Sequence, residues 1–480
     1  YKRRMSALTN EIRQELRQTD PPEASEAPAN VPDIVRIGSL PTNLEMSIDT
    51  DITQPVVISQ NFCRIVLENK GLLHSNSKIT FSMAQSDSVA YFGLGTGAFS
   101  VLERCTLKCG TRTINEIDDF AHYESYRSTF IASENMLERE TVTTGRAIAY
   151  DFDYNNLDNT ESDFIRLDVG REVDNDNSGD TTLPDYMLLP QKAEYQINIS
   201  SLFPFLKMNQ IPLYLLREQV SIELVFKPLA PTKATSARMC VRQGESTTGA
   251  DFNIDLDSIR MIADYIYYPT ELMDAFAKQN TNMTMSYMDY RLSKQSLTSS
   301  TNASNINNIR NVGGNGKIVT KLIVGLSDDS KSQGLLNQYN SMSCYNGTDF
   351  SASLISNVKY NGNFLYPIDV NSYARHFHNV QQAEGTQPFL TKSMYSGETD
   401  DFTDGELEGH DQDGALESHF FRQSYRLNRG ERVNSRGIEL SNNYTLMDDG
   451  GSSKTYTQRC WVESAKLANI SNGVIVCYDA

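Results

Sequence analysis

The alternation of apolar and polar residues along much of the chain constrains its fold more than any other feature. In the segment 220–227, Val-Ser-Ile-Glu-Leu-Val-Phe-Lys, apolar residues occupy every second position, as a strand with one buried face requires. Similar runs recur, separated by segments rich in Asn, Asp, Ser, Thr and Gly, at 62–67, 102–109, 254–268, 317–326, 358–364 and 474–478. The pattern predicts a body that is mostly β.

Two segments depart from this alternation. Residues 117–130 carry apolar and aromatic side chains at i, i+3 and i+6, which predicts a helix inserted between strands. A second short helix is predicted after Pro269, because Thr270 can serve as its N-cap and acidic residues lie early in it. The chain thus divides into an arm and tether (1–48), a first β half (49–268), a helical connector (269–281) and a second β half (282–480). Many short strands in two halves predict two sandwiches of jelly-roll type and leave their topology open.

The composition excludes several classes of protein. The 480 residues include 43 basic and 61 acidic side chains, a formal net charge of −18, which argues against a general nucleic-acid-binding surface. Hydrophobic residues make up 39% of the chain, so it is expected to fold rather than to behave as a disordered acidic polymer. Since no apolar stretch approaches the roughly 20 residues that cross a bilayer, we expect a soluble chain.

The first 18 residues have a different character. They carry an apolar stripe at helical spacing and five basic side chains against two acidic ones, which predicts a short basic amphipathic helix. A tether rich in Pro and Glu follows, so the helix forms an arm separate from the body. The arm is interpreted either as a frayed tail or as a segment that docks on a partner protein or an anionic membrane. Its candidate binding residues are Lys2, Arg3, Arg4, Met5, Leu8, Ile12, Arg13, Leu16 and Arg17.

Seven cysteines are too few for a disulfide scaffold in a chain of this length, and the odd number leaves at least one thiol free. Cys105 and Cys109 are expected on one face of a strand, about 13 Å apart at 3.3 Å per residue, too far to pair or to share one zinc ion. Buried thiols in a reducing compartment are therefore the preferred interpretation, which fits assembly inside a cell.

The order of six segments resembles that of the double jelly-roll major capsid proteins of double-stranded DNA viruses, in polinton-like viruses, virophages or giant viruses. These segments are 98–114, 211–226, 259–268, 317–324, 358–362 and 467–478, the last with an Asn-Gly turn at Asn472-Gly473. The likeness covers most of 50–480 and lies in order and spacing, not in any single motif. The long acidic loops and the basic arm depart from the giant-virus pattern.

The resemblance implies an all-β fold of two consecutive eight-stranded jelly rolls with short inserted helices and an N-terminal amphipathic arm. It implies a homotrimer that forms a pseudo-hexagonal capsomer and tiles an icosahedral shell in the virion. The expected partners are neighbouring capsomers, minor capsid and penton proteins, and an inner membrane or genome contacted through the arm, with no small-molecule substrate and no cofactor. An acidic stretch without Lys or Arg is expected to be an exposed loop of the second roll: Glu398, Asp400, Asp401, Asp404, Glu406, Glu408, Asp411, Asp413 and Glu417.

Two weak metal signals occur. Oxygen-bearing side chains at alternate positions match the first half of an EF-hand-like calcium loop: Asp174, Asp176, Ser178, Asp180 and Asp185. However, the twelfth position is Asp rather than Glu and Pro184 breaks any exiting helix, so an ordinary acidic turn is the preferred interpretation. His376 and His378 would share one face of a strand, but no third ligand is identifiable, and packed or exposed histidines are the preferred interpretation.

No nucleophile elbow, zinc-protease, P-loop or dinucleotide-binding motif occurs in the sequence, so the chain is expected not to be an enzyme. The alternative from another functional class is a β-sandwich carbohydrate-binding protein or glycosidase, which would have the same strands and acidic loops. A minor capsid or penton protein is a third hypothesis, less favoured because pentons usually need only one jelly roll.

Overall fold

The structure is a computed structural model of the whole chain. It describes residues 46–85, 90–91, 97–128, 143–144, 194–227, 240–241, 252–279, 282–298, 305–327, 354–384, 423–427, 430–445 and 455–480. The predicted arm residues 2–17, the calcium candidate at 174–185 and the acidic stretch 398–417 lie outside these described residues.

Eight strands of the first half form two sheets. They are β1 (Ser47–Thr53), β3 (Phe62–Val66), β5 (Lys78–Gln85), β7 (Leu102–Cys109), β8 (Arg112–Asp118), β9 (Glu194–Asn198), β11 (Val220–Phe226) and β13 (Phe252–Tyr267). One sheet contains β1-β13-β5-β9 in that order and the other contains β3-β11-β7-β8. If the eight strands are numbered 1 to 8 along the chain, the sheets have the orders 1-8-3-6 and 2-7-4-5. These orders define an eight-stranded jelly roll.

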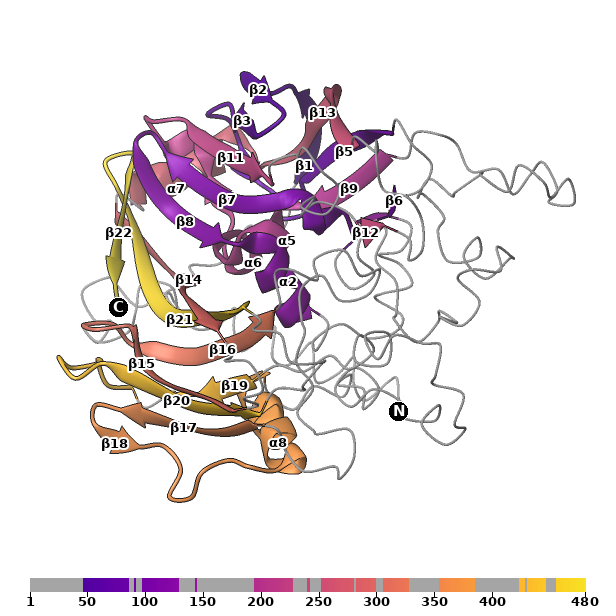
Figure 1. Cartoon of the computed structure of the whole chain (residues 1–480). Helices are drawn as coiled ribbons and strands as arrows, with labels where there is room; N and C mark the ends of the chain where they lie inside the picture. The colour runs from indigo at the N-terminus through magenta and orange to yellow at the C-terminus, as the bar shows by residue number, and fades with distance from the viewer. Residues whose placement is uncertain are drawn as a thin grey trace, which may run out of the picture.

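The second half repeats the same topology. Its strands are β14 (Asn282–Thr298), β15 (Asn305–Gly313), β16 (Val319–Ser327), β17 (Leu354–Tyr360), β18 (Asn363–Phe364), β19 (Gln423–Arg426), β20 (Ile438–Thr445) and β21 (Thr455–Ser471). The sheets β14-β21-β16-β19 and β15-β20-β17-β18 again have the orders 1-8-3-6 and 2-7-4-5. The chain therefore contains two jelly rolls, the first roll above and the second below in Figure 1.

Short strands and helices supplement the two rolls. The extra strands are β2 (Val57–Ser59), β4 (Leu72–Leu73), β6 (Ala90–Tyr91), β10 (Ile211–Pro212), β12 (Cys240–Val241) and β22 (Val474–Asp479). The α-helices are α2 (Phe120–Ser128), α5 (Ile199–Leu202), α6 (Pro204–Met208), α7 (Thr270–Gln279) and α8 (Tyr373–Glu384), and the 3-10 helices are η2 (Gly97–Val101) and η6 (Leu213–Leu215). Within the described residues, two strands that pair either both precede α7 in the sequence or both follow it.

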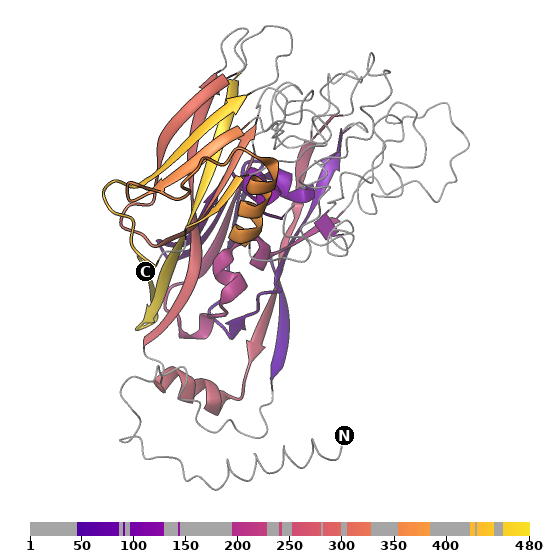
Figure 2. The ribbon, with the colours of Figure 1, turned by 90° about the horizontal axis from the view of Figure 1, so that it is seen from below.

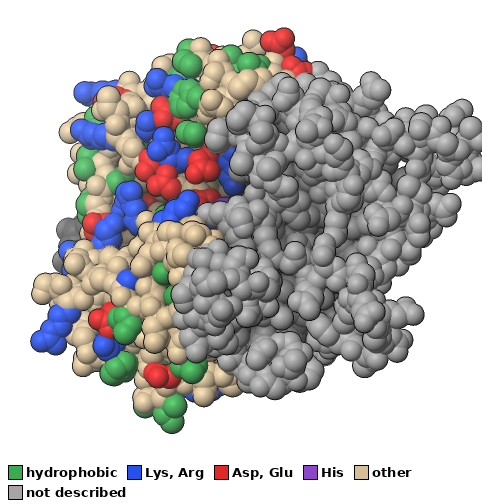
Figure 3. Space-filling view, in the orientation of Figure 1, with side chains coloured by type: hydrophobic (Ala, Val, Ile, Leu, Met, Phe, Trp, Pro, Cys, Tyr) green, Lys and Arg blue, Asp and Glu red, His purple; other side chains and the backbone are tan. Residues whose placement is uncertain are grey.

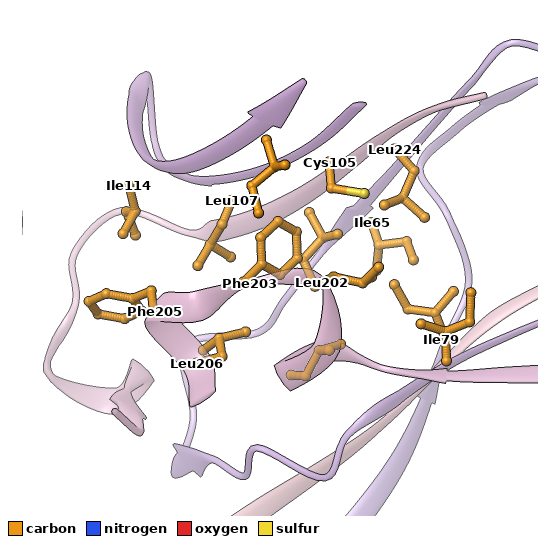
Figure 4. Close-up of a cluster of buried hydrophobic side chains, with 14 of the residues drawn as sticks. Ile65, Ile79, Cys105, Leu107, Ile114, Leu202, Phe203, Phe205, Leu206 and Leu224 are labelled. Atoms are coloured by element: carbon orange, nitrogen blue, oxygen red, sulfur yellow. The ribbon is translucent and has the colours of Figure 1, made fainter. Parts of the chain in front are cut away.

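The core of the first roll lies between its two sheets. Leu202, Phe203 and Leu206 of the segment α5–α6 point into it, where they meet Ile65 and Leu107 from the strands (Figure 4). Each fully buried side chain of this size stabilises the fold by about 1.5–3 kcal/mol. The same cluster continues into the second roll through residues of β14, β16, β21 and β22, whereas a separate cluster fills the second roll itself.

The two ends of the molecule differ. Next to α7, the strands begin and end in the pairs Ser47–Tyr267 and Asn282–Ser471. At the opposite end of the second roll, β14 ends at Thr298, beside Thr455. Figure 2 shows α7 at one end of the molecule and, at the other end, strands that stop at the limits of the described residues. The two ends therefore differ: at the α7 end the strands and their connections are described, and at the opposite end several strands stop where the description is interrupted.

Two expectations need correction. Ile117 is the penultimate residue of β8, and the helix begins only at Phe120, because Asp119 adopts a left-handed backbone with φ 53° that ends the strand. His376 and His378 lie on helix α8, not on a strand. Residues two apart on a helix point in different directions, so His376 is buried and His378 is exposed.

Candidate functional site

A buried hydrophobic cluster continues from the first roll into the second at the junction between them. We define this junction as β8, α2 and α6 on the first roll and β14, β16, β21 and β22 on the second. Aromatic side chains form its centre. Tyr123 of α2 lies 4.8 Å from Tyr290 and 6.0 Å from Trp461, measured between ring centroids. Tyr126 lies 5.7 Å from Trp461. These rings are almost fully buried, and tilted aromatic pairs add about 0.5–1.5 kcal/mol each beyond their buried area.

A glycine makes room for one of these rings. Gly325 of β16 faces the ring of Tyr126, and a Cβ atom at this position would overlap the ring carbons. Gly325 is therefore required for close approach rather than for an unusual backbone angle. The absent side chain lets α2 lie directly on the sheet of the second roll.

A buried ion pair joins the two rolls beside the aromatic centre. Arg459 Nε of β21 lies 2.5 Å from Asp119 Oδ2, and both side chains are buried. His122 Nδ1 donates a hydrogen bond of 2.5 Å to Asp119 Oδ1, since an ionised carboxylate can only accept. Trp461 Nε1 donates to the carbonyl oxygen of Asp118 at 3.3 Å. The turn that separates β8 from α2 is thus held by the second roll.

Burial and charge set the protonation states in this cluster. Burial, together with the nearby Arg459 charge, lowers the pKa of His122 to about 3, so the imidazole is neutral at pH 7. Burial would raise the pKa of Asp119, but His122 and the Arg459 guanidinium hold it well below its usual range. Asp119 is therefore a carboxylate paired with a permanent cation. Such a group holds a junction together, since removing one partner leaves an uncompensated buried charge.

Along β14 the junction is made of specific polar contacts. Asn115 Nδ2 donates to Asp289 Oδ1 at 3.0 Å, and Lys466 Nζ lies 2.7 Å from Asp289 Oδ2. Tyr287 OH donates to the carbonyl oxygen of Ile114 at 2.7 Å. The bonds made by Asn115 and Tyr287 fix the register of β14 against β8, because each pairs a buried polar group with one partner position, and Lys466 balances the charge of Asp289 from within the second roll.

The outer surface of the sheet β3-β11-β7-β8 is charged. Lys108 Nζ lies 2.5 Å from Glu223 Oε2, and Arg64 lies 3.8 Å from the same carboxylate. Figure 3 shows basic and acidic side chains together over this part of the molecule. The mixture of signs is typical of a solvated protein surface and not of a phosphate-binding one.

Large apolar side chains are exposed elsewhere on both rolls. In the first roll they are Met46, Ile48, Ile52, Val56, Val57, Ile58 and Met208. In the second roll they are Ile309, Ile355, Phe364, Ile368, Val476 and Tyr478. Exposed apolar side chains that gather on strand edges are a common feature of protein interaction sites.

The predicted arm residues, the calcium candidate and the acidic stretch lie outside the described residues, and of the candidates named from the sequence only His376 and His378 are described. Among the described residues, no three His, Cys, Asp or Glu side chains are grouped so that they could hold a metal ion. His376 Nε2 donates to the carbonyl oxygen of Leu354 at 3.2 Å, and burial lowers its pKa to about 4. This buried histidine therefore has a packing role.

The prediction of buried, unpaired thiols is confirmed for four of the five cysteines whose side chains are described. Cys63, Cys105, Cys109 and Cys460 are free and buried, and Cys477 is free and half-buried. Burial raises the pKa of Cys63 and of Cys460 to about 12. These two thiols are therefore poor nucleophiles. None of the described helices combines the length and apolar character needed to traverse a bilayer.

The junction residues were not predicted from the sequence. Asp119 and Arg459 are 340 positions apart, so no local pattern links them. The available signals were the aromatic residues at helical spacing in 117–130 and the single Trp of the chain, Trp461, within an alternating run of strand residues.

No protein-family model matches this chain, and no curated protein matches it in sequence. Solved structures do match. The VP54 protein of PBCV-1, in a crystal structure fitted into a reconstruction of the virophage Sputnik, gives a TM-score of 0.58 at 10% identity, over 93% of this chain and 100% of that chain. The mavirus major capsid protein gives a TM-score of 0.52 at 9% identity, over 96% of this chain and 95% of that one. The Faustovirus major capsid protein gives 0.51 at 10% identity, over 91% and 93%.

These likenesses extend over nearly the whole of each chain, so they concern both rolls and their arrangement. At identities of 9–10% they establish the fold. The predicted resemblance is confirmed at this level: the chain has the two-roll architecture of the solved capsid proteins.

Proposed function

We propose that this chain is the major capsid protein of an icosahedral double-stranded DNA virus, that it forms trimers, and that the trimers tile the shell of the virion. The observation that carries the proposal is the repeated jelly-roll topology within one chain, together with a likeness to two major capsid proteins that covers more than nine tenths of the sequence. Two equivalent rolls side by side give each subunit two similar wedges, and three such subunits supply the six that a pseudo-hexagonal tile needs.

The proposal assigns the chain a structural role without enzymatic activity. The titratable groups buried at the junction support this, since Asp119, His122 and Arg459 satisfy one another across the two rolls. They are placed to hold the rolls together, not to meet a substrate. The partners proposed are neighbouring capsomers, with minor capsid and penton proteins at the edges of the shell.

The division of the chain into an arm (1–48), two rolls (49–268 and 282–480) and a connector (269–281) is part of the same proposal. It is supported by the strand pairing, which nowhere crosses α7 within the described residues. The arm is proposed to lie on the inner side of the shell. The acidic stretch 398–417 is proposed to be an exposed loop of the second roll.

The proposal is tested by purifying the full chain and measuring its mass in solution by light scattering, followed by electron microscopy. We expect a trimer that appears as a pseudo-hexagonal tile. A monomer at micromolar concentration that binds a sugar saturably would instead support the carbohydrate-binding alternative.

A further inference from the structure

Two of the described cysteines lie at the edge of the junction, one on each roll. Cys109 is the last residue of β7 in the first roll, and Cys477 lies on β22, which follows the last strand of the second roll. Cys109 belongs to the buried cluster that continues from one roll into the other, and Cys477 packs against this cluster. Both thiols are free.

Two contacts hold β22 against the part of the first roll that contains Cys109. Arg112 pairs with Cys109 across the turn between β7 and β8, and its Nη1 donates to the carbonyl oxygen of Ile475 at 3.1 Å. The backbone N–H of Arg217, just before β11, donates to the carbonyl oxygen of Gly473 at 2.9 Å. Figure 1 shows β22 beside the turn that joins β7 and β8.

The alternation of side chains along β22 directs Cys477 towards the first roll. Ile475 is fully buried, and Cys477, two residues further along the strand, lies on the same side of it. Val476 and Tyr478, on the other side, are 45% and 44% exposed. Cys477 itself is half-buried, whereas Cys109 is fully buried. A small molecule from solvent therefore meets Cys477 first.

The charges around the two thiols act on both of them. Burial raises the pKa of Cys109, while the backbone N–H of Ile475 and the Arg112 guanidinium act in the opposite direction. Burial also raises the pKa of Cys477, while the Tyr287 hydroxyl and the Arg112 charge lower it. One guanidinium therefore favours the thiolate form of both cysteines, which is the form that attacks a disulfide.

We propose that Cys109 and Cys477 form a disulfide bond that joins the two rolls covalently when the protein enters an oxidising environment. In a reducing compartment the two thiols stay free, as they are in the structure. A disulfide requires the two Cα atoms to lie within about 7 Å of each other. Among the described residues β22 pairs only with β21, so this strand can adjust towards the β7–β8 turn as the bond forms.

The oxidant is a low-molecular-weight disulfide such as oxidised glutathione, and the exchange has two steps. The Cys477 thiolate attacks one sulfur of the small disulfide, so that a mixed disulfide forms at Cys477 and one small thiol leaves. The Cys109 thiolate then attacks Cys477 Sγ and displaces the second small thiol. The protons of the two protein thiols end on the two released thiols, and the two electrons lost by the protein reduce the small disulfide.

The test is to incubate the full chain with oxidised glutathione, to denature it in the presence of N-ethylmaleimide and to measure its intact mass. The reduced chain is expected to take up seven labels, one for each cysteine, and the oxidised chain two fewer. Trypsin without reductant is then expected to release the segment 109–112 joined to the segment 467–480, each of which contains one cysteine.

The bond is also expected to raise the thermal unfolding midpoint by about 5 °C, because it closes a loop that spans most of the chain. Dithiothreitol should reverse this shift. Cys477→Ser should lose no label on oxidation and should show no shift. Cys460→Ser is the matched control: Cys460 is a free, buried thiol on β21 of the same roll, and this variant should still lose two labels and show the shift.

Three outcomes would each overturn the proposal. The oxidised chain could keep all seven labels, Cys477 could stop at the mixed disulfide with glutathione, or two chains could be linked through their Cys477 residues on a non-reducing gel. None of these outcomes bears on the capsid proposal, since the bond lies within a single chain. A trimer measured by light scattering tests that proposal separately.

Discussion

At the scale of single residues, the junction depends on the absence of one side chain. Gly325 is on a central strand of the second roll, where Gly normally weakens a sheet because it buries little surface and loses much conformational freedom. Here it admits the ring of Tyr126, which then packs on Trp461. The loss within the strand is offset by contact between the rolls.

We therefore expect Gly325→Ala to destabilise the protein by about 1–3 kcal/mol, the usual range for overpacking a filled core. The thermal unfolding midpoint measures this. In a chain that already carries Tyr126→Ala, the ring is gone and Gly325→Ala should cost much less. Equal effects of Gly325→Ala in both backgrounds would show that Tyr126 does not limit the space at Gly325.

The buried histidines predict how stability depends on pH. His122 has a pKa of about 3 in the folded protein, against an ordinary value of 6.5 in the unfolded chain. Between these values the unfolded chain takes up a proton that the folded protein does not. Stability due to this residue is thus unchanged above pH 6.5 and decreases as the pH falls from 6.5 towards 3. His376, with a pKa of about 4, acts in the same direction.

Unfolding midpoints measured across this pH range test the prediction. His122→Gln keeps a donor for Asp119 but cannot be protonated, so the decline on acidification should become shallower. His378→Gln, on the exposed side of α8, is the matched control and should leave the decline unchanged. If His122→Gln follows the native curve, His122 is not the group responsible.

At the scale of elements, each roll inserts a helix between its fifth and sixth strands, α2 in the first roll and α8 in the second. The sequence indicated α2 because its aromatic residues have helical spacing. It did not indicate α8, because the alternation His376-Phe377-His378 resembles a strand over three residues, and three residues are too few to distinguish a period of 2 from one of 3.6.

The predicted strands agree with the structure where one surface of the strand is buried and the other is polar. The strand β7 has the predicted bounds, Leu102–Cys109, and β11 ends one residue before the predicted end. The pairing order could not be predicted, because alternation fixes which side of a strand is buried and not which strand lies next to it. The junction could not be predicted either, since it joins residues far apart in the chain.

At the scale of the whole molecule, the strands of both rolls run between two unlike ends. One end has α7 and tight turns such as Asn472-Gly473, and the other has the interrupted strand ends. In a shell this arrangement would give every subunit an inner and an outer end. Since β1 begins at the α7 end, the N-terminal segment joins the first roll at that end.

Deleting residues 1–30 is therefore expected to impair assembly of the shell while the trimer still forms. The reason is that both rolls and the junction between them lie within residues 46–480. Light scattering of the purified variant measures the trimer, and electron microscopy of assembly reactions measures the shell. Loss of the trimer itself would contradict the role proposed for the arm.

The helix α7 connects the two rolls, yet none of its residues is buried. The rolls are held together by the aromatic centre, the ion pair and the β14 contacts, none of which involves α7. We therefore expect the two rolls to stay associated even when the chain is cut within α7. A gene split within α7 should yield two polypeptides that still assemble into one subunit, and fusion of two once-separate rolls would have required no new interface.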